Sequence, residues 1–94
     1  MRVSYSEEAI ADIVDVLSFL SERNAVAAAR LDTSITVCIE RLAAGEFEGP
    51  ISRLRSGTLV RSWPVPPMRV YYQRHQEELF IVRVYHQARR PIAK

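Results

Sequence analysis

Six side chains that could act on a phosphate lie in the C-terminal part of the chain, most of them in the stretch "RVYHQARRP" at residues 83–91. They are Arg69, Arg83, Tyr85, His86, Arg89 and Arg90. Cleavage of RNA without a metal needs a base to take the 2′-hydroxyl proton, cations to stabilise the phosphate and an acid for the leaving oxygen. If the chain is a nuclease, its catalytic candidates are Arg83, His86 and Arg89.

The same six residues could instead contact a macromolecular partner. Arginine pairs with carboxylates and phosphates, and tyrosine packs well at protein surfaces. Alternation along a strand puts Arg83 and Tyr85 on one face and His86 on the other, so these three do not converge as a catalytic set. A plainer interpretation is a solvated tail for the arginines and a structural role for His86, held by hydrogen bonds at a strand end. We favour partner contact over catalysis for this set.

The residues that other catalytic sites need are missing or far apart. The chain has one cysteine, Cys38, and two histidines at distant positions, which gives no zinc-binding spacing. Its three glycines form no phosphate-binding loop. We therefore expect no metal and no cofactor. The lone cysteine and the lack of an apolar run of about 18 residues also predict a cytoplasmic protein without membrane contact.

The formal net charge of +2 hides a strong asymmetry between the two halves. Residues 1–52 hold four arginines and nine acids, a net charge of −5, and residues 53–94 hold nine basic residues and two acids, a net charge of +7. Such a split indicates an acidic element and a basic surface with separate partners. The alternative is that the two halves attract each other within the fold.

Apolar spacing predicts a short strand and two helices in the N-terminal half. Residues 1–5 alternate as a strand, Ser6 is placed to cap a helix that ends near Arg23, and Asn24 can cap a second helix that ends before Gly45. The short connection predicts an antiparallel hairpin. Each helix has one apolar stripe at steps of three and four residues. The first stripe is Ile10, Ile13, Leu17 and Leu20, and the second is Ala28, Leu31, Ile35, Cys38 and Leu42.

Three strands are predicted in the C-terminal half. Residues 46–57 are expected to be loop, residues 58–63 a strand that "PVPP" stops, and residues 68–74 and 78–86 two further strands joined by a polar turn. In the last strand one set of side chains is expected to face the helices: Phe80, Val82 and Val84. The other set is expected to face away: Leu79, Ile81, Arg83 and Tyr85. The order β-α-α-β-β-β predicts an α+β domain over residues 1–94, with the helical hairpin on one face of an antiparallel sheet.

This ordered set of segments resembles the RelE/ParE superfamily of toxins from bacterial type II toxin–antitoxin systems. The resemblance lies in "SEEAIADIVDVLSFL" and "NAVAAARLD", then "LRSG", the "RVYYQ" strand and the "RVYHQAR" ending, and it covers nearly the whole chain. It implies a toxin that a co-transcribed antitoxin neutralises by wrapping a segment over it. It also implies a hetero-oligomer that binds operator DNA only through the antitoxin.

The superfamily contains two activities. RelE-like members cut messenger RNA in the ribosomal A site, and ParE-like members poison DNA gyrase without nuclease chemistry of their own. Active RelE-like enzymes carry basic residues on the middle strands and a tyrosine or a His–Tyr pair in the tail, whereas this chain has "SWPVPPM" and "PIAK" there. The resemblance therefore favours a ParE-like gyrase poison, not an enzyme, with a ParD-like antitoxin. An RNA-cleaving toxin and an inactive member that only binds its antitoxin stay open as alternatives.

Overall fold

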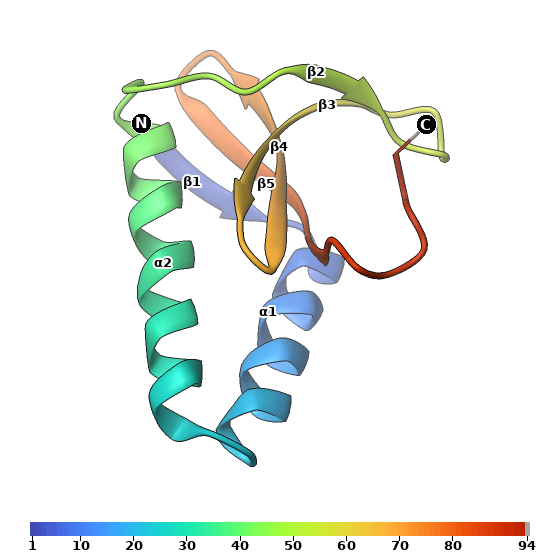
Figure 1. The fold of residues 1–94 in the computed structure, drawn as a ribbon. Coiled ribbons are helices and arrows are strands. Elements are labelled where there is room, and N and C mark those ends of the chain that lie inside the picture. Colours follow the sequence, from blue (N-terminus) through green and yellow to red (C-terminus); the bar gives the residue numbers. More distant parts are fainter. Residues whose placement is uncertain (94) are drawn as a thin grey trace.

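Two helices pack against one face of a five-stranded sheet (Figure 1). The computed structural model describes residues 1–93. This order of elements confirms the predicted α+β fold, with a helical hairpin after a short first strand. The elements are β1 (Arg2–Tyr5), α1 (Glu7–Ser21), α2 (Ala25–Ala43), β2 (Ile51–Arg53), β3 (Leu59–Val65), β4 (Met68–His75) and β5 (Glu78–His86).

The strands lie side by side in the order β1-β5-β4-β3-β2. Neighbouring strands from β2 to β5 pair antiparallel, whereas β1 pairs in parallel with β5. The sheet is therefore mixed, and the prediction of an antiparallel sheet is wrong for β1. A parallel pair needs a long crossover, and both helices and three strands separate β1 from β5 along the chain. The pairing continues to the start of α1, where the Ser6 N–H donates to the Ile81 carbonyl at 3.0 Å.

Side-chain caps begin both helices at the predicted residues. Ser6 Oγ accepts a hydrogen bond from the Ala9 N–H at 2.9 Å, and Asn24 Oδ1 accepts one from the Ala27 N–H at 3.0 Å. Each cap satisfies a backbone donor that the first helical turn leaves unpaired. Gly45, just beyond α2, has a φ of 75°, the left-handed conformation predicted for it. Of the helices in residues 1–93, none is both long and apolar enough to span a bilayer.

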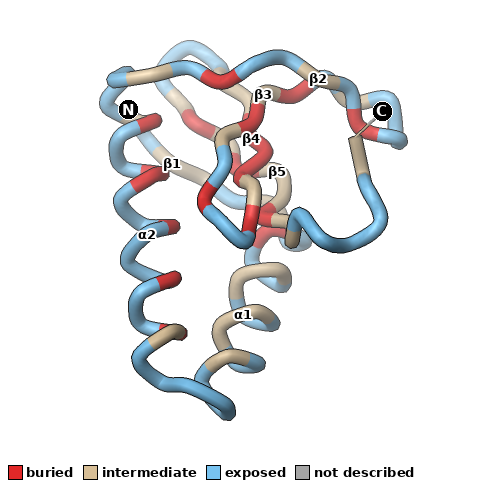
Figure 2. Tube along the Cα trace, in the orientation of Figure 1, coloured by how far each residue is buried: buried red, intermediate tan, exposed pale blue. Residues whose placement is uncertain are grey.

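The larger core lies between the helices and the sheet. The predicted α1 stripe is only partly correct, because Ile10 is 52% exposed and Ala9 is fully buried instead. The rest of that stripe is half-buried, as the tan turns of α1 in Figure 2 show. The chain therefore leaves part of the apolar surface of α1 uncovered. The predicted α2 stripe is buried throughout: Ala28, Leu31, Ile35, Cys38 and Leu42.

A β-bulge in β5 interrupts the alternation of its side chains. Tyr72 pairs with Ile81 and Tyr71 pairs with Arg83, so Val82 has no partner on β4. An extra residue of this kind shifts every later side chain to the other face of the sheet.

The bulge overturns part of the prediction for the last strand. Leu79 and Ile81 are fully buried against the helices, whereas Phe80 and Val82 are half-buried on the opposite face. Val84 is fully buried on the helix side, as expected, because the extra residue returns it to the face of Ile81. Unbroken alternation would have put Ile81 and Val84 on opposite faces.

Two other segments differ from the sequence prediction. Part of the expected loop forms the edge strand β2, and β3 continues through Pro64 to Val65 although "PVPP" was expected to stop it. Pro64 is tolerated because its nitrogen points to the same side as the Ser62 N–H, which donates to the Pro50 carbonyl. β2 does not extend to Pro64, so no backbone acceptor on that strand is left without a donor.

A hydrogen-bond network around the fully buried Tyr72 fixes the connection between α2 and β2. The Tyr72 hydroxyl donates to Glu48 Oε1 at 2.6 Å and accepts the Gly49 N–H at 2.8 Å. Nε and Nη2 of Arg74 donate to the Glu48 carboxylate, each at 3.1 Å. Gly49 is required by space, because a Cβ there would lie 1.8 Å from the Ser62 carbonyl oxygen.

A smaller apolar cluster lies on the open face of the sheet, opposite the helices. It consists of Leu54, Val60 and Tyr71. The C-terminal tail turns back over this cluster, where Ile92 and Ala93 pack and Ala93 forms a β-bridge with Leu54. The tail therefore lies against the sheet, although the side chains at positions 87–91 are exposed.

Candidate partner-binding site at the end of the last strand

Arg83 is bound by a carboxylate of α1. Its Nε and Nη2 lie 2.7 and 2.9 Å from the two oxygens of Asp12, and the same carboxylate accepts the Val84 N–H at 3.0 Å. Hydrogen bonding to Asp12 raises the pKa of Arg83 and outweighs the opposite effect of burial. The guanidinium carbon also lies 5.1 Å from the centroid of the Tyr85 ring. The charge of Arg83 is therefore balanced within the chain.

The next two candidates in the strand make hydrogen bonds to the tail. The Tyr85 hydroxyl donates to the Arg90 carbonyl at 2.9 Å, and the Ala88 N–H donates to Nδ1 of His86 at 3.0 Å. Because Nδ1 accepts this bond, a neutral His86 ring carries its proton on Nε2. The lone pair that a general base would use is then already engaged. This contact agrees with a structural role for His86, which holds the start of the tail.

Three of the six candidate residues share one hollow. Tyr85, His86 and Arg89 line a groove of about 580 Å³ between the end of β5 and α1, which we call the C-terminal groove. Phe19, which is 55% exposed, gives α1 an aromatic group in this groove. Two acids of α1 also line it, Asp12 and Asp15. The groove therefore combines aromatic surface with charges of both signs.

The other three candidates lie elsewhere. Arg83 lines a separate hollow of about 470 Å³ on the open face of the sheet. Arg69, on β4, donates to Ser62 Oγ at 3.0 Å, and the side chain of Arg90 is exposed to solvent. The structure therefore does not bring all six residues into a single site.

The charge asymmetry is partly balanced inside the fold. Arg61 and Arg74 pair with Glu48, and Arg83 pairs with Asp12, so cations of the basic half meet acids of the acidic half. Attraction between the two halves within the fold therefore accounts for these pairs, and separate partners for the two halves stay a prediction. Among residues 1–93, several arginines of the basic half have no carboxylate within 4.0 Å: Arg53, Arg55, Arg69, Arg89 and Arg90.

The part of the chain that the structure describes offers neither a metal site nor a reactive thiol. No group of three or more His, Cys, Asp or Glu side chains in residues 1–93 could hold a metal ion. Burial raises the pKa of the Cys38 thiol, and the nearby charge of Arg41 lowers it by less. Cys38 is therefore a protonated core residue at neutral pH.

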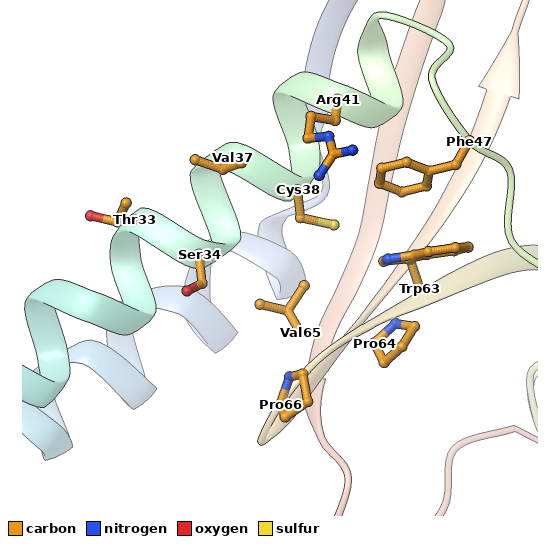
Figure 3. A pocket seen from close by; sticks show the side chains of 10 residues that line it. All are labelled: Thr33, Ser34, Val37, Cys38, Arg41, Phe47, Trp63, Pro64, Val65 and Pro66. Carbon is orange, nitrogen blue, oxygen red and sulfur yellow. The ribbon is translucent and has the colours of Figure 1, made fainter.

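Sequence reasoning missed a further groove, between α2 and β3 (Figure 3). Phe47 and Trp63 line it as an aromatic pair, with ring centroids 4.2 Å apart and planes inclined at 31°. The guanidinium carbon of Arg41 lies 5.3 Å from the centroid of Phe47. Nothing in the spacing of Phe47 and Trp63 links them, because one lies in an expected loop and the other at an expected strand end. The one feature of the sequence that could have indicated this groove is Val37, an aliphatic residue that lies away from the buried stripe of α2.

Comparison with solved structures defines the class of fold. A structure described as the chromosomal ParDE TA system from P. aeruginosa matches with a TM-score of 0.72 and 18% sequence identity, over 92% of this chain and 95% of that chain. At this identity the likeness establishes a shared fold. The family model described as the ParE toxin of type II toxin-antitoxin system, parDE, matches residues 3–91. The chain therefore belongs to the ParE toxin family, as its resemblance implied. No curated protein matches it.

Proposed function

We propose that this ParE-family toxin arrests growth by binding DNA gyrase and holding it on cleaved DNA, without catalysing a reaction itself. The gyrase target follows from the resemblance to ParE-like members, and one structural observation supports it over RNA cleavage. Two of the three candidate nuclease groups are engaged within the chain. Arg83 pairs with Asp12, and the acceptor nitrogen of His86 is taken by the Ala88 N–H.

The C-terminal groove and the adjoining tail are the proposed contact surface for gyrase. Arg89 and Arg90 are exposed, and neither has a carboxylate partner among residues 1–93. Exposed guanidinium groups of this kind suit contact with DNA phosphate or with an acidic protein surface. Tyr85 and Phe19 add aromatic surface beside them. Binding through these groups requires no proton transfer.

A ParD-like antitoxin neutralises the toxin in this proposal. The two chains form a hetero-oligomer in the cytoplasm, and the antitoxin binds operator DNA through its own N-terminal part. The uncovered surface of α1 outside the C-terminal groove supports a partner of this kind, since Ile10 and Val14 are 52% and 55% exposed. We further propose that residues 1–94 form one toxin domain.

Induction of the chain in a bacterial host without its antitoxin tests the proposed target. We expect a DNA-damage response and stabilised gyrase–DNA cleavage while protein synthesis continues. Rapid arrest of translation with cut messages would overturn the gyrase assignment. A folded chain that causes no growth arrest would be an inactive member that only binds its antitoxin.

A ribosome-dependent RNA endonuclease is the second candidate, because Tyr85, His86 and Arg89 do share the C-terminal groove. For this chemistry His86 must first release the Ala88 N–H and then act as the base. Loss of message cleavage in His86→Ala, with an unchanged unfolding midpoint, would favour this candidate. Message that stays intact under the native chain would exclude it.

A further inference from the structure

The groove between α2 and β3 continues along the outer side of α2. Its first part, about 460 Å³, is lined by the aromatic pair Phe47 and Trp63 and by Arg41 (Figure 3). A second hollow, shallow and open to solvent, lies over the first turns of α2 and shares Thr33 and Ser34 with the first. The two hollows therefore form one continuous surface, which we call the α2 track.

The α2 track exposes apolar side chains on a helix whose opposite side is buried in the core. Val26 and Val37, which line it, are 60% and 43% exposed. Single exposed aliphatic residues are ordinary, but these two are continuous with the half-buried Trp63. A partner that covered the track would remove this apolar surface from water.

The charged side chains of the α2 track are basic, although most residues of the track belong to the acidic half of the chain. Residues 1–52 have a net charge of −5. Among the residues that line the two hollows, however, the charged ones are Arg30 and Arg41, and none is an acid. The track is thus an apolar strip with a cation near each end, which complements an apolar segment that carries carboxylates.

Both arginines are available to a partner. Within residues 1–93, Arg30 has no carboxylate within 4.0 Å. Arg41 pairs with Glu46 at 3.2 Å, but the two side chains are 55% and 50% exposed. Ion pairs that are this exposed contribute little to stability. Exchange of Glu46 for a carboxylate of the partner therefore costs little.

We propose that the α2 track is the docking site of an acidic amphipathic helix of the antitoxin. This inference rests on the proposed function, which supplies the antitoxin. The rise of an α-helix places Arg30 and Arg41 about 16 Å apart along α2. A helix that lies along the track presents two carboxylates at a similar separation, with apolar side chains between them over Val37 and Trp63.

The α2 track and the C-terminal groove share no residue. The track is formed by α2 and β3 with the connection after α2, whereas the groove is formed by α1, the end of β5 and the tail. The antitoxin helix and the proposed gyrase contact therefore occupy different surfaces. Substitutions in one surface can be tested without altering the other.

The partner for the test is the full-length protein encoded next to this chain, titrated against the purified toxin by calorimetry. We expect Arg30→Glu and Arg41→Glu each to raise the Kd about tenfold, because each places a like charge opposite a carboxylate. Arg53→Glu makes the same change of charge on β2, outside the track, and should bind within about twofold of the native chain. Equal unfolding midpoints of the three variants show that the fold is intact.

Trp63 reports occupancy of the track directly, because it is the one tryptophan of the chain. A chain labelled with 5-fluorotryptophan gives a single fluorine resonance, which should shift when the partner binds. An unshifted resonance, or native affinity in both track variants, would overturn the site and leave the antitoxin assignment intact. A native chain that does not bind at all would overturn both. Growth arrest by the free chain tests the gyrase proposal independently.

Discussion

Asp12 of α1 and Arg83 of β5 form a two-point ion pair that joins the helical hairpin to the last strand of the sheet. Arg83 Nε lies 2.7 Å from one carboxylate oxygen, and Nη2 lies 2.9 Å from the other. The side chains of Asp12 and Arg83 are 13% and 27% exposed, so the pair is better shielded from water than a surface pair. Arg83, one of the three catalytic candidates from the sequence, thus has a structural partner.

Replacement of Asp12 tests the strength of this connection. Asp12→Ala removes both hydrogen bonds to Arg83 and the bond to the Val84 N–H, and it leaves a partly buried guanidinium unpaired. We expect the free energy of unfolding to fall by about 2 kcal/mol. Urea unfolding with an unchanged m-value measures this loss. The control is Asp15→Ala on the same helix, which is exposed and should change stability by less than about 0.5 kcal/mol.

The hydrogen bonds of Glu48 lead us to predict that the folded chain loses stability in acid. Burial alone would raise its pKa, but hydrogen bonds from Arg74 and Tyr72 together outweigh burial and hold the pKa below the ordinary 4.5. A carboxyl group with a lowered pKa stabilises the fold above its unfolded pKa, and this contribution is lost as the pH falls through the folded pKa. Between about pH 5 and pH 3 the native chain should therefore lose more unfolding free energy than Glu48→Gln. Parallel pH profiles for the two proteins would contradict this assignment.

Glycine is favoured at positions 49 and 45 for two different physical reasons. A methyl group at Gly49 would meet the Ser62 carbonyl oxygen at 1.8 Å, so Gly49→Ala should cost about 3 kcal/mol of unfolding free energy. Gly45 has a φ of 75° with open space around it, so Gly45→Ala meets only backbone strain, about 1 kcal/mol. Thermal or urea unfolding ranks the two variants. A smaller cost at Gly49 than at Gly45 would mean that the connection after α2 relaxes freely.

Arg89 and Arg90 in the tail are exposed and have no carboxylate partner among residues 1–93. We therefore predict that reversing their charge reduces toxicity. The double variant Arg89→Glu and Arg90→Glu should raise the fraction of cells that survive induction more than about tenfold, because like charge now faces the proposed gyrase–DNA contact. The unfolding midpoint should stay unchanged, since both side chains are exposed. A matched double reversal at exposed arginines elsewhere, Arg30→Glu with Arg53→Glu, should keep full toxicity. Undiminished growth arrest by the tail variant would place the gyrase contact on another surface.

Local features of the fold could be predicted from the sequence because they depend on residues close together in the chain. The Ser6 and Asn24 caps and the left-handed Gly45 each involve a few neighbouring residues, and all three are present. The α2 stripe is buried as predicted, since helical spacing alone determines which side chains share a face. The order of segments was also sufficient to identify the toxin family.

Features that depend on strand register came only from the tertiary structure. The unpaired Val82 reverses the faces expected for the first half of β5, and a bulge is a property of two paired strands rather than of one. The parallel pairing of β1 with β5 likewise joins segments from opposite ends of the chain.

The same distinction applies to the candidate sites. The sequence by itself determined which residues could serve as cations, bases and aromatic contacts, because residue type and alternation are local properties. Only the fold decided that Arg83 is paired with Asp12, that His86 and Arg89 share a groove with α1, and that Phe47 meets Trp63 beside α2. Each of these contacts joins residues from different elements, so its geometry follows from how the hairpin packs on the sheet.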